Sequence, residues 1–173
     1  MIKDSETQAR FLALLQSHRA LLYKVARIFG RTVDERDDLA QEAIVQLWRA
    51  YPRYDQTLKF STWMYRIALN VAISWRRRER TQTQHLVPSG EELFQNVAAL
   101  DASQIDAKGE LELLHSMIDR LDDLNKALLM LYLDGQSHQE ISAVLGISAS
   151  NVGTKIARLK DGLREDLRAA GHL

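Results

Sequence analysis

The residues SHQEISAVLGISASNVGTKIARL, at positions 137–159, contain the local signals that decide the fold of this chain. Ser137 and Glu140 have the spacing of a capping box, which predicts the start of a short helix, and Gly146 predicts its end. Ser148 is a good N-cap for a longer helix that follows. A short helix, a glycine turn and a longer helix together predict a helix-turn-helix.

The longer helix divides into an apolar side and a polar side. Its apolar residues recur at intervals of three and four and would be buried: Val152, Ile156, Leu159 and Leu163. The polar side begins with small groups that could enter a major groove and continues with cations that could reach phosphates or base edges. These candidate DNA-binding residues are Ser148, Ser150, Asn151, Thr154, Lys155 and Arg158. A simple helical hairpin is the less favoured alternative, because packing alone does not require polar groups at the start of the helix.

Outside this motif, apolar periodicity predicts helices rather than strands. The expected helices cover 8–29, 34–51 and 61–80 in the N-terminal part, with Asp34 as the N-cap of the second, and 110–121 and 124–134 in the C-terminal part. The predicted fold class is therefore all-α, with two small domains. A three- to four-helix bundle occupies 1–80, a flexible linker occupies 81–109, and the helix-turn-helix domain occupies 110–173.

The charge of the chain is zero overall but unevenly distributed. Residues 1–80 contain 15 Lys/Arg against 9 Asp/Glu, residues 81–135 contain 3 against 10, and residues 136–173 contain 5 against 4. The zero total removes any argument from whole-chain charge for nucleic acid or membrane binding. A uniformly solvated surface would not be expected to divide the charge between a basic N-terminal part and an acidic middle.

Composition also excludes several classes of function. A length of 173 residues argues against a single large enzyme domain. With no cysteine there is no disulfide, thiolate zinc site or cysteine nucleophile. The five histidines are far apart, and no phosphate-binding loop or catalytic triad is evident, so we expect no catalytic residue, no metal and no cofactor. The polar N-terminus and the lack of a long apolar run predict a soluble cytoplasmic protein without membrane insertion.

The helix predicted over 34–51 has an unusual outer face. Leu39, Ala40, Ala43, Leu47 and Ala50 would face the core. The opposite arc mixes apolar, acidic and amide groups, as interaction surfaces often do. Its residues are Asp38, Gln41, Glu42, Val45, Trp48 and Arg49, of which the first five are the candidate binding residues. From spacing alone, the slightly favoured alternative is that Trp48 covers the edge of the core and the acids are solvated.

The helix predicted over 61–80 and the loop before it combine aromatic, basic and amide groups. Stacking planes beside cations suit unpaired bases, because stacking contributes ~1–3 kcal/mol per base and cations hold phosphates. The candidate residues are Arg53, Tyr54, Asp55, Lys59, Ser61, Thr62, Arg66, Asn70 and Arg77. Core packing remains the simpler interpretation of Trp63 and Trp75, and a solvated helix end that of the arginine run at 76–80.

Two sets of motifs resemble one family. The segments DDLAQEA at 37–43, LWR at 47–49 and FSTWMYRIALN at 60–70 resemble region 2 of bacterial sigma-70-family factors. The segments QEIS at 139–142, LGIS at 145–148 and KIARL at 155–159 resemble region 4. Two regions joined by a short linker are the layout of the extracytoplasmic-function (ECF) group, and the resemblance covers about residues 10–168.

The resemblance implies a sigma factor that binds core RNA polymerase and directs transcription initiation at −35/−10 promoters. The outer face of the helix over 34–51 would dock on the β′ clamp helices, and the loop and helix over 53–77 would melt the −10 element and hold a flipped base. The last helix would read the −35 element, its domain would touch the β flap, and the acidic linker would thread the RNA-exit path. The resemblance further implies an anti-sigma factor as a partner, which in many members is membrane-bound and would hold the protein at the inner membrane.

One departure from the family pattern concerns Gly153, where many members carry a basic residue. Together with the zero net charge, this predicts weak promoter binding without polymerase. Three other classes remain as alternatives: a two-domain DNA-binding regulator, an enzyme and a helical adaptor. The face containing Asp38, Gln41 and Glu42 argues against the regulator, the scattered histidines against the enzyme, and the polar start of the last helix against the adaptor.

Overall fold

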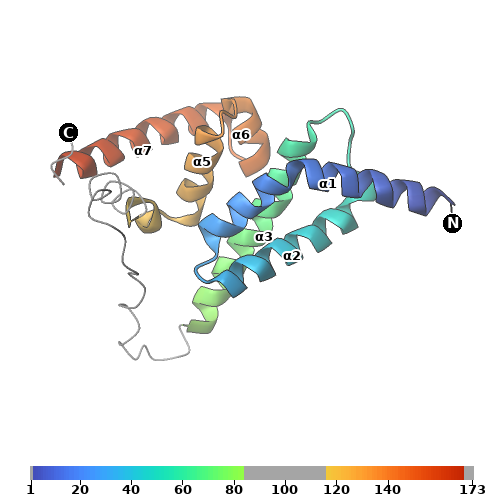
Figure 1. The fold of residues 1–173 in the computed structure, drawn as a ribbon. Helices are drawn as coiled ribbons and strands as arrows, with labels where there is room; N and C mark the ends of the chain where they lie inside the picture. Colours follow the sequence, from blue (N-terminus) through green and yellow to red (C-terminus); the bar gives the residue numbers. More distant parts are fainter. Residues whose placement is uncertain (1, 84–115, 170–173) are drawn as a thin grey trace, which may run out of the picture.

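Three long helices form the N-terminal half of the protein. The structure is a computed structural model and describes residues 2–83 and 116–169. Helix α1 spans Ile2–Phe29, α2 spans Val33–Ala50 and α3 spans Phe60–Thr83, with the short 3-10 turn η1 at Tyr51–Arg53. The three helices pack on one another around a buried apolar core (Figure 1). The predicted helical bundle is therefore confirmed.

The start of α2 differs from the prediction. Its N-cap is Thr32 rather than Asp34: the backbone of Thr32 is extended, and its Oγ1 accepts a hydrogen bond of 3.1 Å from the backbone N–H of Glu35. The carboxylate of Glu35 in turn accepts from the backbone N–H of Arg31 at 2.7 Å. Thr32 therefore caps the helix, and Asp34 lies in the first turn, where its charge suits the helix dipole.

The C-terminal half contains the predicted helix-turn-helix. Helix α5 spans Asp123–Leu133, α6 spans His138–Leu145 and α7 spans Ala149–Ala169. Both bonds of the capping box between Ser137 and Glu140 are present, and Gly146 ends α6 with a φ of 70°. Glycine suits this left-handed position because a Cβ would strain it.

Part of the predicted organisation cannot be compared with the structure. The linker predicted over 81–109 lies outside the described residues beyond position 83, where α3 ends, and the helix predicted over 110–121 does so up to position 115. Residues 116–120 are helical, as predicted. Within 2–83 and 116–169, no helix is long and apolar enough to cross a membrane.

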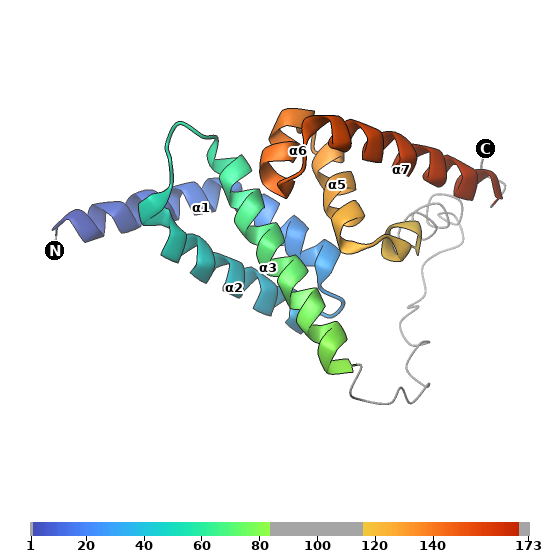
Figure 2. The same ribbon diagram turned by 180° about the vertical axis from the view of Figure 1, so that it is seen from behind.

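Helix α3 is packed on two sides. Helices α1 and α2 lie against one side, and α5 and α6 pack on the other (Figure 2). The buried apolar residues of both halves consequently form one continuous cluster. Met64 and Ala68 are buried, and so are Tyr65, Leu69 and Ala72, so the buried residues of α3 extend beyond one stripe. Contact with the C-terminal half explains this wider buried surface.

Candidate functional site

The outer face of α2 is exposed and chemically mixed. Asp38 and Gln41 are exposed, and Val45 and Trp48 leave 41% and 42% of their surface open to solvent. One side of the Trp48 ring packs on Phe11, with 5.1 Å between the ring centroids. Trp48 therefore both covers the edge of the core and contributes apolar surface among polar groups. We call Asp38, Gln41, Glu42, Val45 and Trp48 the α2 face.

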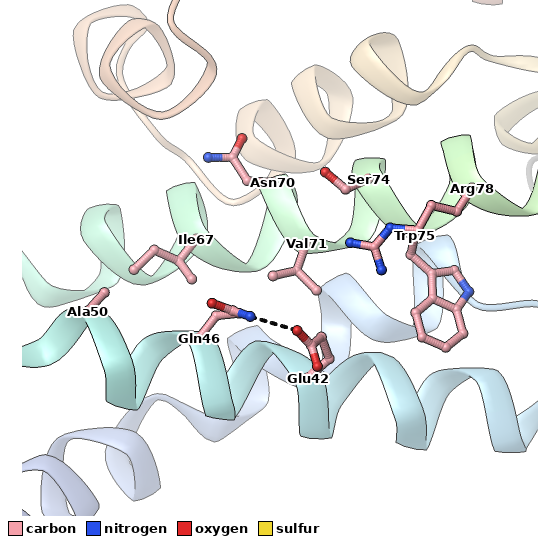
Figure 3. Close-up of a pocket in the computed structure, with 9 residues that line it drawn as sticks. All are labelled: Glu42, Gln46, Ala50, Ile67, Asn70, Val71, Ser74, Trp75 and Arg78. Carbon is pink, nitrogen blue, oxygen red and sulfur yellow. Dashed lines mark hydrogen bonds between the residues drawn. The ribbon is translucent and has the colours of Figure 1, made fainter.

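A groove between α2 and α3 borders this face. It encloses about 330 Å³ and is shown in Figure 3. Glu42 lines it from α2, where its Oε1 accepts a 2.7 Å hydrogen bond from Gln46 Nε2. Asn70 lines it from α3. Glu42 and Asn70 were predicted to serve different partners, and the structure brings them to the two walls of one groove.

The loop that follows α2 is shaped by its own aromatic side chains. The Tyr54 ring lies 4.7 Å from Trp63 and 5.5 Å from Phe60, and its hydroxyl donates a 2.6 Å hydrogen bond to the carbonyl of Leu58. Burial raises the pKa of Tyr54. Tyr54 is therefore half-buried and fixes the loop conformation, while Arg53 is exposed beside it.

Asp55 stabilises the next turn of the same loop. Its Oδ1 accepts hydrogen bonds from the backbone N–H of Thr57 at 2.9 Å and from the Thr57 hydroxyl at 2.8 Å. The backbone bond and then the hydroxyl bond lower the pKa of Asp55. Asp55 accordingly organises the backbone between α2 and α3, and it remains exposed.

The polar side of α3 presents the remaining predicted residues. Arg66, Asn70 and Arg77 are exposed, while Ser61 and Thr62 are half-buried. Together with the loop residues Arg53, Tyr54, Asp55 and Lys59 they form what we call the loop–α3 face.

Lys59 of the loop–α3 face also contacts the C-terminal half. Its Nζ lies 2.6 Å from Glu140 Oε1. The hydrogen bond from Lys59, followed by the bonds from Ser137, lowers the pKa of Glu140 to about 2. Glu140 therefore carries its negative charge at neutral pH, both as part of the capping box and as the partner of Lys59.

The polar side of α7 is the third surface. Ser148 caps the helix, because its Oγ accepts a 3.2 Å hydrogen bond from the backbone N–H of Asn151, which confirms the predicted cap. Ser150, Asn151, Thr154 and Arg158 are exposed, and Lys155 is half-buried. We call these six residues the α7 face. Lys155 and Arg158 also line a groove of about 370 Å³ between α7 and residues 117–125.

Gly153 lies in the first half of α7 and has no steric reason to be glycine. A Cβ at this position would lie 3.5 Å from the His138 ring, which is an ordinary contact distance. We expect Gly153→Ala to stabilise the protein by about 1 kcal/mol, because alanine is favoured over glycine in a helix interior. Urea unfolding checks this prediction, with the exposed Gly162→Ala in the same helix as a reference. A lower stability of Gly153→Ala would contradict it.

A set of charged residues lies between the two halves, which the sequence pattern did not predict. Arg76 is only 9% exposed and lies 3.9 Å from Asp123 of α5, which is 8% exposed. Arg80 contacts the same carboxylate at 3.0 Å. From the sequence alone, the simpler interpretation of Arg76 and Arg80 is a solvated basic helix end. The uneven distribution of charge along the sequence was the available signal for these ion pairs, but it does not show which cation meets which carboxylate.

Comparison with known proteins supports the resemblance found in the sequence. The family model described as Sigma-70 region 2 matches residues 14–82, and the one described as Sigma-70, region 4 matches residues 111–161. The α2 face and the loop–α3 face lie within the first match, and the α7 face lies within the second.

Relatives match along nearly the whole chain. The RNA polymerase sigma factor CnrH of Cupriavidus metallidurans is 30% identical, with 90% of this chain and 85% of CnrH covered. The ECF RNA polymerase sigma factor SigW of Bacillus subtilis is 27% identical, with 93% and 90% covered. Among solved structures, CnrH in complex with the cytosolic domain of CnrY matches with a TM-score of 0.67 and 27% identity, over 94% of this chain and 90% of that chain. The chain therefore belongs to the sigma-70 family, as an ECF sigma factor that directs transcription initiation and is not an enzyme.

Proposed function

We propose that the α2 face binds core RNA polymerase through its β′ clamp helices. The observation that carries this proposal is the exposure of Val45 and Trp48 beside the charged and amide groups of the same face. Isolated apolar residues on a surface need no explanation, but a tryptophan surrounded by polar groups is typical of an interface centre. The position of this face within the region 2 match supports the same partner.

We propose that the other two faces bind promoter DNA. The loop–α3 face has exposed cations and an amide close to an aromatic cluster, which suits a melted −10 element. The α7 face begins the second helix of a helix-turn-helix with small polar groups, which suits the major groove of the −35 element. Contact of the C-terminal domain with the β flap completes the proposed assembly, which places the protein in the cytoplasm with the polymerase.

We also propose that an anti-sigma factor controls this protein. The support is its similarity to CnrH, whose structure was solved in complex with the cytosolic domain of CnrY. Such a factor would hold the protein at the inner membrane if it is itself membrane-bound.

The proposed polymerase contact is tested by co-elution of the full chain with core RNA polymerase. We expect the wild type to co-elute with core polymerase. About tenfold less of the Asp38→Ala/Glu42→Ala variant should co-elute, because this variant lacks two carboxylates of the α2 face. A matched control is Asp161→Ala/Glu165→Ala, which removes two exposed carboxylates from α7, outside all three faces.

The outcomes separate the alternatives. If co-elution fell equally for the control variant, the decrease would reflect a general effect of removing negative charge and not a contact made by the α2 face. Failure of the folded wild type to associate with polymerase would overturn the proposed contact and leave the α7 face as the one DNA-binding proposal that does not depend on polymerase.

A further inference from the structure

A cavity at the turn between α1 and α2 is strongly basic. It encloses about 1000 Å³ and is completed by α3 and by residues near the start of α5. Among the described residues, five cations and one carboxylate line it: Arg27, Arg31, Arg36, Arg76, Lys126 and Asp119. None of these residues belongs to the α2 face, the loop–α3 face or the α7 face. The cavity therefore lies outside the surfaces assigned to polymerase and promoter.

Three arginines at the turn contribute charge that is not neutralised by ion pairs. Arg27 and Arg31 are exposed, and neither forms an ion pair with a residue in 2–83 or 116–169. Arg36 is half-buried and donates hydrogen bonds to the carbonyl oxygens of Gly30 at 3.1 Å and Arg31 at 3.4 Å. These bonds hold the guanidinium group in place, but a neutral carbonyl leaves its positive charge unbalanced.

Lys126 extends from α5 into the same cavity as a buried ammonium group. Its side chain is 7% exposed, and its ion-pair partner within residues 2–83 and 116–169 is Asp119, whose side chain is 78% exposed. The 3.6 Å between Lys126 Nζ and Asp119 Oδ1 is longer than a hydrogen bond. Burial of a charge is costly unless the group is paired and hydrogen-bonded. An anion in the cavity would supply the contacts that this ammonium group lacks.

The remaining charge indicates what kind of anion fits. Arg76 is already paired with Asp123 at 3.9 Å and with Glu79 at 3.2 Å. The other lining residues comprise four cations and one carboxylate, an excess of three positive charges. A single phosphate group carries about two negative charges at neutral pH, so linked phosphates match this excess better. Guanidinium groups also suit phosphate because they donate two parallel hydrogen bonds to its oxygens.

We propose that this cavity binds a small polyphosphate, either as the free anion or as the phosphate chain of a nucleotide. Its volume of about 1000 Å³ is sufficient for a molecule of that size. A nucleic-acid strand is a poorer fit, because such strands need exposed aromatic rings for base stacking. The aromatic residue in the described lining is Phe29, which is only 3% exposed. Binding at this site depends on neither polymerase nor promoter DNA.

Calorimetric titration of the full chain with sodium tripolyphosphate tests the proposal. We expect one site per chain, with an affinity that falls as salt is added. Inorganic monophosphate should bind at least about tenfold more weakly, because it matches less of the positive charge. Titrations with ATP and GTP distinguish the two sources of the phosphate chain. Equal affinity for tripolyphosphate and nucleotide assigns recognition to the phosphates alone, and tighter nucleotide binding adds a contact of the base with the apolar part of the lining.

The first variant removes the two exposed arginines. Arg27→Ala/Arg31→Ala should bind tripolyphosphate at least about tenfold more weakly than the wild type, since two charged donors are lost. Arg19→Ala/Arg168→Ala is the matched control, because it removes two exposed arginines of α1 and α7 that lie outside the cavity. The control should bind within about twofold of the wild type. Circular dichroism establishes that both variants are folded.

The second variant separates binding from stability. Lys126→Met keeps the length of the side chain and removes its buried charge. It should weaken tripolyphosphate binding about tenfold, while the unliganded variant unfolds at a temperature no lower than the wild type, because a weakly paired buried charge is gone. A purely structural lysine would give the opposite pattern, with lower stability and unchanged binding.

Three results would overturn the proposal. The first is no binding of tripolyphosphate to the wild type up to ~5 mM. The second is a loss of affinity in Arg27→Ala/Arg31→Ala no greater than in its control. The third is binding of a short oligodeoxythymidine at these arginines without binding of tripolyphosphate, which would assign the cavity to nucleic acid. Co-elution of Arg27→Ala/Arg31→Ala with core RNA polymerase should match the wild type, so this site and the proposed function fail or succeed separately.

Discussion

Replacing Trp48 with alanine is expected to weaken binding to core RNA polymerase by about 30-fold, the effect of ~2 kcal/mol. Trp48 leaves 42% of its surface exposed while its ring is supported by Phe11 at 5.1 Å. A large side chain held in one orientation loses little conformational entropy on binding, which is why such residues are often binding hot spots. Titration of labelled protein with core polymerase measures the change in affinity.

Tyr23→Ala is the matched control for this prediction. Tyr23 is an aromatic residue of α1 that is 56% exposed and lies outside the three proposed binding faces. Its removal should leave the affinity within about twofold of the wild type, since surface contacts outside an interface contribute little. If Trp48→Ala bound polymerase as tightly as Tyr23→Ala, the α2 face would not be the main contact.

Replacing Leu47 with alanine is expected to destabilise the protein by about 3 kcal/mol. Leu47 is 0% exposed in the core between the three N-terminal helices. Removal of a buried leucine costs the transfer free energy of its methyl and methylene groups and leaves a cavity, together about 2–5 kcal/mol. Urea unfolding followed by circular dichroism measures the free energy of unfolding.

Leu12→Ala provides the comparison, because Leu12 is 52% exposed in the same bundle. It should change the free energy of unfolding by less than about 0.5 kcal/mol. A Leu47→Ala variant no less stable than Leu12→Ala would show that the core assigned to α2 is not the one present in solution.

Most of the fold could be predicted from the sequence because its signals are local. The capping box at Ser137 and Glu140, the glycine at position 146 and the apolar spacing of α2 each act within a few residues. The N-cap of α2 was misplaced by two residues, at Asp34 instead of Thr32. Several side chains near a helix start can serve as its cap, and the path of the preceding chain selects one of them.

The candidate surfaces were predicted less completely than the helices. Periodicity correctly separated the buried Leu47 from the exposed Val45 on α2. It did not show that Tyr54 and Asp55 are engaged in shaping their own loop, because aromatic packing and side-chain-to-backbone bonds depend on the loop conformation. The roles of these faces in binding stay predictions that the polymerase and promoter experiments address.

The sequence by itself determined the helices, most of their ends and the helix-turn-helix, because these depend on neighbours a few positions apart, and its motifs identified the family. Only the tertiary structure decided that α3 is buried on two sides, that Arg76 meets Asp123 and that Lys59 meets Glu140. These partners are separated by dozens of residues, and an exposed charge and a buried, paired charge look the same in a sequence. Their difference arises from desolvation and from the position of the opposite charge, which exist only once the two halves are packed together.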